Sequence, residues 1–116
     1  MPTMFRLQDL TNVAANLRQP VEDAVDVSAF KSLVIQVRIP AFATGTSKLI
    51  FITSATTEET SYAEPSYWAS SQIDLTAAGG TIQIVVLENP LGFLRWETIN
   101  MSGSADFLID VIAREV

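Results

Sequence analysis

The sequence predicts an all-β fold: a single domain, residues 1–116, forming an antiparallel β-sandwich of about eight strands. Apolar residues recur at a period of two, and the runs that contain them are rich in β-branched side chains. Clusters of Gly, Pro, Ser and Asn interrupt these runs about every ten residues, a spacing typical of sandwiches and barrels. A chain of 116 residues is the size of one domain with its own core.

Five runs show the clearest alternation, and each is bounded by turn-forming residues. They are residues 33–39, 49–53, 82–87, 94–98 and 106–111. Weaker strands are predicted at residues 4–8, 12–17, 25–28 and 72–75. No segment predicts a long helix. Residues 9–18 allow one helical turn at most, because Pro20 would end it.

Several strands carry apolar residues on both faces. In the run at 82–87 the stronger stripe is Ile82, Ile84 and Val86, which we expect to face the core. The opposite faces of the runs still hold apolar residues, namely Val34, Ile50, Val85 and Leu108. Because a sandwich strand needs only one buried face, two explanations remain open. Either the N-terminal segment and the loop at 55–72 cover these residues, or a neighbouring subunit does.

The composition excludes several kinds of site. The chain has no Cys and no His, so it holds no disulfide, no thiolate or imidazole metal site and no Ser-His or Cys-His nucleophile system. The net charge is −6, and the 7 basic residues are scattered, which argues against nucleic-acid binding. No apolar run is long enough to span a membrane. The first residues lack the pattern of a secretory signal, so we expect folding in the cytoplasm.

The acidic residues show no ligand or catalytic spacing. Glu22, Asp23 and Asp26 lack the alternation and the glycine of a calcium loop, and so does the acidic group at residues 58–64. We therefore interpret both as solvated turns, with no metal and no cofactor. A glycosidase needs two facing carboxylates, but no spacing supports such a pair. We expect that the protein is not an enzyme.

Four aromatic residues allow two interpretations. Tyr62, Tyr67, Trp68 and Trp96 would form a sugar-stacking platform if they were exposed together. However, Trp96 lies in phase with Leu94 and is predicted to be in the core, and Trp68 is predicted to plug the sandwich edge. Tyr62 and Tyr67 are then the exposed pair, and tyrosine is enriched in protein interfaces.

The N-terminal segment is unusually apolar. Residues 1–20 are expected to form either an edge strand or an arm that docks on a partner. In the second case Met4, Phe5 and Leu7 are its anchors. Together with Tyr62 and Tyr67 they form our candidate partner-binding set.

Two stretches resemble small structural proteins of tailed phages and prophages, of the capsid decoration or head cement type. Residues 25–41 (VDVSAFKSLVIQVRIPA) resemble one segment of these proteins, and residues 91–97 (LGFLRWE) with 102–107 (SGSADF) resemble their closing hairpin. The resemblance covers about residues 25–114. It implies a jelly-roll-like sandwich on a virion.

The resemblance leads to our functional expectation. It implies a non-enzymatic decoration protein on the outer surface of a phage capsid, assembled in the host cytoplasm, with the major capsid protein or another virion protein as its partner. Such proteins are often trimers, so the resemblance also implies a homo-oligomer. No binding residues transfer from it. The alternatives are a carbohydrate-binding module and a component of a phage tail or baseplate.

Overall fold

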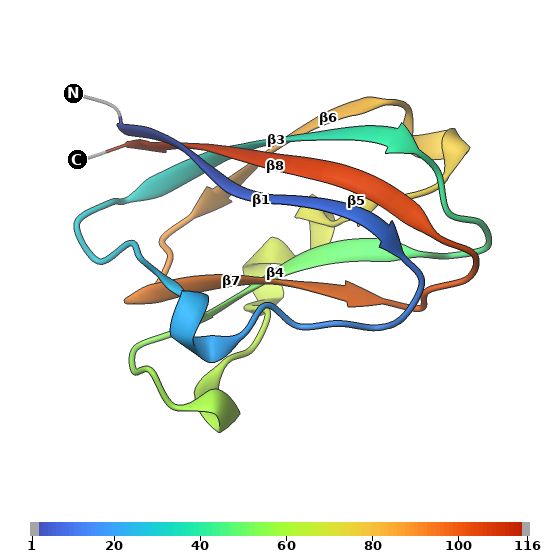
Figure 1. Ribbon diagram of the computed structural model, residues 1–116. Helices are drawn as coiled ribbons and strands as arrows, with labels where there is room; N and C mark the ends of the chain where they lie inside the picture. The colour runs from blue at the N-terminus through green and yellow to red at the C-terminus, as the bar shows by residue number, and fades with distance from the viewer. Residues whose placement is uncertain (1–2, 115–116) are drawn as a thin grey trace.

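The protein is a sandwich of two four-stranded antiparallel sheets, and the computed structural model describes residues 3–114 (Figure 1). The strands are β1 (Thr3–Val13), β2 (Val25–Asp26), β3 (Ser32–Ala41), β4 (Lys48–Ser54), β5 (Ile73–Asp74), β6 (Ile82–Glu88), β7 (Phe93–Ile99) and β8 (Ala105–Arg114). The only helical elements among these residues are short 3-10 turns: η1 (Val21–Asp23), η2 (Glu59–Ser61), η3 (Ser66–Ser71) and η4 (Ala77–Gly79). The predicted all-β class is confirmed.

The strand order is that of a jelly roll. One sheet has the order β1-β8-β3-β6 and the other has the order β2-β7-β4-β5. All four of these pairs are antiparallel: β4/β5, β3/β6, β2/β7 and β1/β8. In sequence order each pair encloses the one before it, with β4/β5 innermost and β1/β8 outermost. The chain is thus folded back on itself and then wrapped into two layers, which is the jelly-roll arrangement.

The core lies between the two sheets and follows the predicted alternation on most strands. On β3 the inward residues Leu33, Ile35, Val37 and Ile39 are fully buried. Trp96 of β7 is buried as predicted. Its ring packs edge to face on Phe107 of β8, with the centroids 5.9 Å apart. Such aromatic pairs join the two layers and contribute beyond their buried area.

The prediction for β6 was wrong about which face points inward. Ile82, Ile84 and Val86 are 56%, 62% and 46% exposed, whereas Leu87 is buried. Gln83 fixes which face of β6 points inward. Its side-chain amide exchanges two hydrogen bonds with the backbone of Asp74, on strand β5 of the other sheet. A period of two shows that a strand has two faces, but it cannot assign them when both are apolar.

The weaker strands are confirmed in part. The run at 4–8 belongs to the long strand β1, while β2 and β5 are shorter than predicted. The predicted strand at 12–17 was wrong. Asn12 has a positive φ of 54°, the pairing with β8 ends at Val13, and the following residues form no helical turn either. Of the two alternatives for the N-terminal segment, the described residues from Thr3 onward form an edge strand.

We expect Trp96→Ala to lower the free energy of unfolding by about 3–5 kcal/mol, since truncation of a buried large aromatic leaves a cavity. Chemical denaturation followed by circular dichroism measures this. Trp96→Phe keeps most of the ring and is expected to cost less. An Ala variant as stable as the wild type would contradict the core role of this ring.

Candidate protein-binding surface

The outer face of the β2-β7-β4-β5 sheet is covered by the chain itself. Two segments lie below it in Figure 1: residues 17–24, which include η1, and residues 55–65, which include η2. Under them Ile50, Ile52 and Tyr62 form a second, smaller core outside the sandwich. The expectation that the loop at 55–72 covers Ile50 is confirmed.

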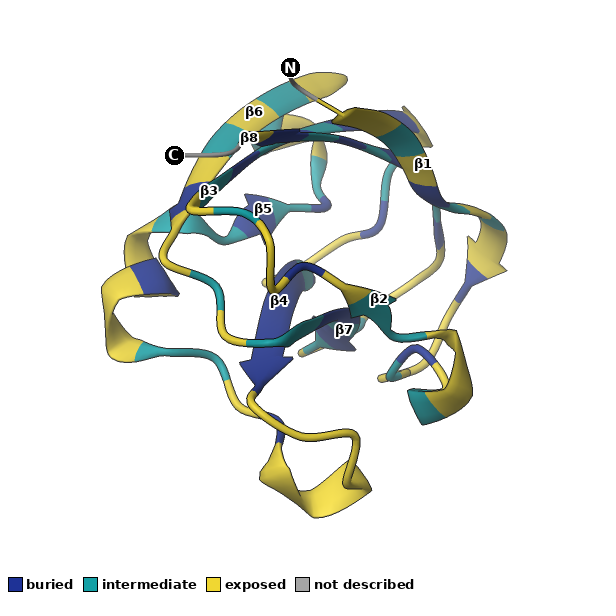
Figure 2. Ribbon diagram, turned by 90° about the vertical axis from the view of Figure 1, so that its left-hand side faces the viewer, coloured by how far each residue is buried: buried dark blue, intermediate teal, exposed yellow. Residues whose placement is uncertain are grey.

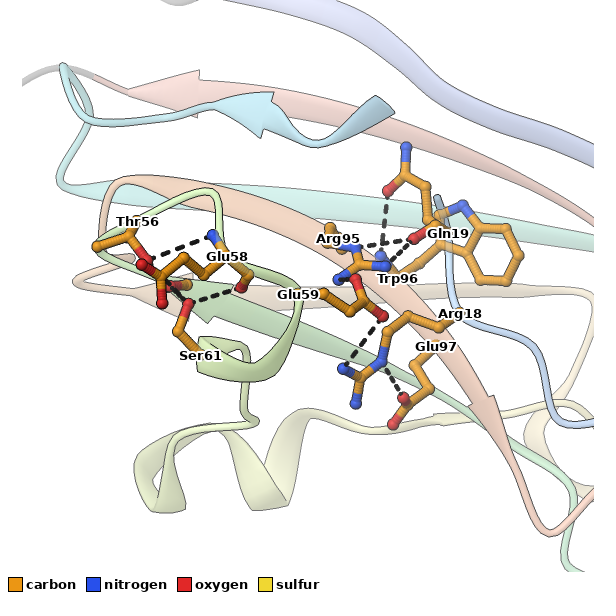
Figure 3. Close-up of polar contacts among 10 residues, drawn as sticks. Arg18, Gln19, Thr56, Glu58, Glu59, Ser61, Arg95, Trp96 and Glu97 are labelled. Carbon is orange, nitrogen blue, oxygen red and sulfur yellow. Dashed lines mark hydrogen bonds and ion pairs between the residues drawn. The ribbon is translucent and has the colours of Figure 1, made fainter. Parts of the chain in front are cut away.

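A buried arginine ties both covering segments to the sheet (Figure 3). Arg95 of β7 is only 1% exposed. Its Nε donates a hydrogen bond of 2.7 Å to the carbonyl oxygen of Gln19, and Nη2 donates to the same oxygen. Its Nη1 lies 2.6 Å from Oε2 of Glu59, in ion-pair contact without hydrogen-bond geometry. One guanidinium thus holds a residue from each covering segment.

Neighbouring contacts reinforce this attachment. Arg18 Nε donates a hydrogen bond of 2.6 Å to Oε2 of Glu97 on β7. The side-chain oxygen of Gln19 accepts a bond from the backbone N–H of Trp96, and its amide nitrogen donates to the carbonyl of Asp23. The segment before β2 is therefore held by side chains as well as by backbone bonds.

The expectation that Tyr62 is exposed was wrong. Tyr62 is 5% exposed, and the Arg95 guanidinium carbon lies 4.6 Å from the centre of its ring, in a cation–π contact. Burial raises the pKa of its phenol, and the positive charge of Arg95 opposes that rise. Tyr62 therefore belongs to the covering layer and is not available to a partner.

The four aromatic residues do not form a common exposed platform. Trp68 and Trp96 are buried together with Tyr62, and only Tyr67 is exposed, at 54%. Trp68 Nε1 donates a hydrogen bond of 2.8 Å to the carbonyl of Glu88, at the end of β6. Its buried ring therefore lies at the edge of the sandwich, where the sequence analysis placed it. The Tyr67 hydroxyl donates to the carbonyl of Asn89.

The outer face of the β1-β8-β3-β6 sheet is different: among residues 3–114, no segment lies above it in Figures 1 and 2. We call it the exposed sheet face. Ile84 is 62% exposed on it and Met4 is 76% exposed. One row of paired residues crosses all four strands and is entirely apolar: Met4, Ile112, Val34 and Val86. The full apolar set is Met4, Val34, Ile82, Ile84, Val86, Leu108 and Ile112.

A shallow hollow of about 440 Å³ lies on the exposed sheet face. Its lining extends from Met4 on β1 to Ile84 on β6 and includes Gln36 and Asp110. Arg6 Nε lies 2.8 Å from Oδ1 of Asp110, and this hydrogen bond holds the pKa of the Asp110 carboxyl below its usual range. The hollow is therefore largely apolar, with one ion pair beside it.

The five predicted anchors do not lie together. Met4 is on the exposed sheet face and Tyr67 is exposed beside the turn that holds Asn89. Phe5 is half-buried and Leu7 is 8% exposed, and both pack on the sandwich core, as an edge strand requires. The sequence analysis missed Ile82, Ile84 and Val86 as surface residues. Their only signal was the surplus of apolar residues on both faces of the strands.

The described residues show no sign of a metal site or of a membrane span. Within residues 3–114, no three Asp or Glu side chains come together in a way that would hold a metal ion. No helix in that part of the chain has the length and apolar character needed to cross a membrane. Comparison of the sequence with models of known protein families and with curated proteins finds no match.

We expect Arg95→Ala to lower the free energy of unfolding by about 3–5 kcal/mol, since it breaks a buried network and removes the packing of a large side chain. The matched control is Arg6→Ala, which breaks an ion pair between side chains that are 47% and 37% exposed. That change is expected to cost about 0–1 kcal/mol. If Arg95→Ala and Arg6→Ala lost the same free energy of unfolding in chemical denaturation, Arg95 would not anchor the covering segments.

Proposed function

We propose that this protein is a non-enzymatic structural component of a phage virion that binds the outer surface of the capsid and stabilises it. The observation that carries the proposal is the exposed sheet face. Monomeric soluble proteins rarely leave large contiguous apolar patches open to water, and such patches usually mark protein interfaces. Within residues 3–114 the loops cover one sheet and leave the outer face of the other bare, which suits a domain that functions within an assembly.

The mechanism would be passive. A cement protein binds the assembled shell, where several subunits together present its site, and not the free subunits. Binding then favours the assembled state by mass action. A jelly roll suits this role because its two packed sheets form a rigid body, so strain on the shell is passed to the contacts. Attachment of an oligomer at several points would strengthen the effect through a high effective concentration.

The arrangement of the aromatic rings favours a protein partner over a carbohydrate. A sugar-binding platform needs ring faces open to solvent, and three of the four candidate rings are buried. Tyr67 alone is exposed, and its hydroxyl is already bonded to Asn89. A tail or baseplate component would use the same apolar face. Binding to shells or to tails is therefore what separates the two roles by experiment.

The test is cosedimentation of the purified protein with empty shells and, separately, with isolated tails of the phage concerned. We expect saturable binding to shells, and Ile84→Asp should weaken it at least tenfold, since charge at an interface anchor removes a large part of its energy. Leu17→Asp is the matched control, because Leu17 is 45% exposed but lies away from the exposed sheet face.

Two results would contradict the capsid proposal. Wild-type protein that stays in the supernatant with shells has no capsid role, and pelleting with tails alone would assign it to the tail. Circular dichroism of each variant shows whether a loss of binding reflects a loss of fold. Deletion of the first residues is not a clean test, because Phe5 and Leu7 pack on the core.

A further inference from the structure

We propose that the occupant of the exposed sheet face is a second copy of this chain, packed face to face about a two-fold axis. The inference concerns the free protein: the proposed function gives the same face to the shell, so shell binding and this dimer exclude each other at any one face.

The area is sufficient for a stable pair. Four strands spaced about 4.8 Å apart, with about 3.4 Å per residue over the ten residues of β3, give a face on the order of 600 Å². Two such faces would remove about 1,200 Å² from water, which is the lower end of the range for specific interfaces. Face-to-face packing of one sheet on another is a common way for sheets to bury an apolar face.

The charges favour a copy over a strongly charged partner. The exposed sheet face holds three arginines and four carboxylates, a net of −1, so the rest of the chain carries −5 of the formal −6. Two copies therefore repel each other least across this face. Charges of both signs can also pair across a two-fold axis, where each copy supplies the same set. The charged residues are Arg6, Arg38, Arg114, Asp9, Glu88, Asp106 and Asp110.

The shape of the face is self-complementary. The exposed residues Ile82, Ile84 and Val86 make an apolar ridge along β6, at one margin of the sheet. The hollow extends from this ridge across the sheet to Met4 on β1. A two-fold axis along the middle of the sheet, between β8 and β3, places the ridge of each copy over the Met4 end of the hollow of the other. The same contact is then made twice, as in any isologous interface.

Association through the sheet edges is disfavoured. On β6 the carbonyl of Glu88 accepts a bond from Trp68, and that of Val86 accepts a bond from Ser71, so η3 occupies this edge. On β1 the pairing with β8 is interrupted by two register shifts, after Arg6 and after Leu10. Bulges of this kind hinder the addition of another strand. The face, and not an edge, is therefore the surface for a second copy.

The first experiment is sedimentation equilibrium of the full chain. We expect a mass of twice 12.7 kDa for the wild type. Ile84→Asp should weaken self-association at least tenfold, and Leu17→Asp should leave it unchanged. A wild-type monomer, a trimer, or an Ile84→Asp variant that remains fully dimeric would overturn the inference. A wild-type monomer that still pellets with shells would overturn it while leaving the proposed function intact.

A second experiment uses the absence of cysteine from the chain. Gln36 lies on β3 on the exposed sheet face, close to the proposed axis. In Gln36→Cys, two thiols facing each other across that axis should be oxidised by added oxidant to an intermolecular disulfide, seen as a dimer on a non-reducing gel. Leu17→Cys is the control and should remain monomeric on that gel. Equal cross-linking of both variants, or none of Gln36→Cys, would contradict face-to-face packing.

Discussion

The guanidinium of Arg95 is the contact on which the division between covered and bare surface depends. It lies under two loops that come from distant parts of the chain, and it bonds one through the Gln19 carbonyl and the other through Glu59. A buried charge is tolerated only when it is compensated. Here the Gln19 carbonyl accepts hydrogen bonds, the Glu59 carboxylate lies in ion-pair contact and the Tyr62 ring packs on the guanidinium. Without this compensation, Ile50 and Ile52 would lie open to water as the residues of the other sheet do.

The sequence predicted the parts of the fold that depend on one strand at a time. Leu33, Ile35 and Val37 alternate with more polar neighbours, so their direction could be read from β3 alone. Trp96 could be assigned to the core because it is in phase with Leu94. The all-β sandwich class followed from the number of strands and the spacing of the turns, without any need to know which strands pair, whereas the jelly-roll form was implied only by the resemblance.

The errors arose where a residue's surroundings come from elsewhere in the chain. Tyr62 is buried because of Arg95, a partner on a strand that no local pattern connects to the loop. The face of β6 is set by Gln83, whose side-chain amide bonds the backbone of Asp74 on β5 and of Gly80. A polar residue at an inward position looks like a surface residue in the sequence, and its apolar neighbours then look like core.

The two sheets differ in what the chain has left to cover them. The connections from β1 to β2 and from β4 to β5 are the long ones, and both pass outside the β2-β7-β4-β5 sheet. The connections that flank β3, β6 and β8 are short, so within residues 3–114 no connection is long enough to lie over the other sheet. The apolar row from Met4 to Val86 is therefore not a defect of packing that local adjustment could remove. In the proposed dimer, a second copy of the chain brings to this row a face of the same width with compatible charges.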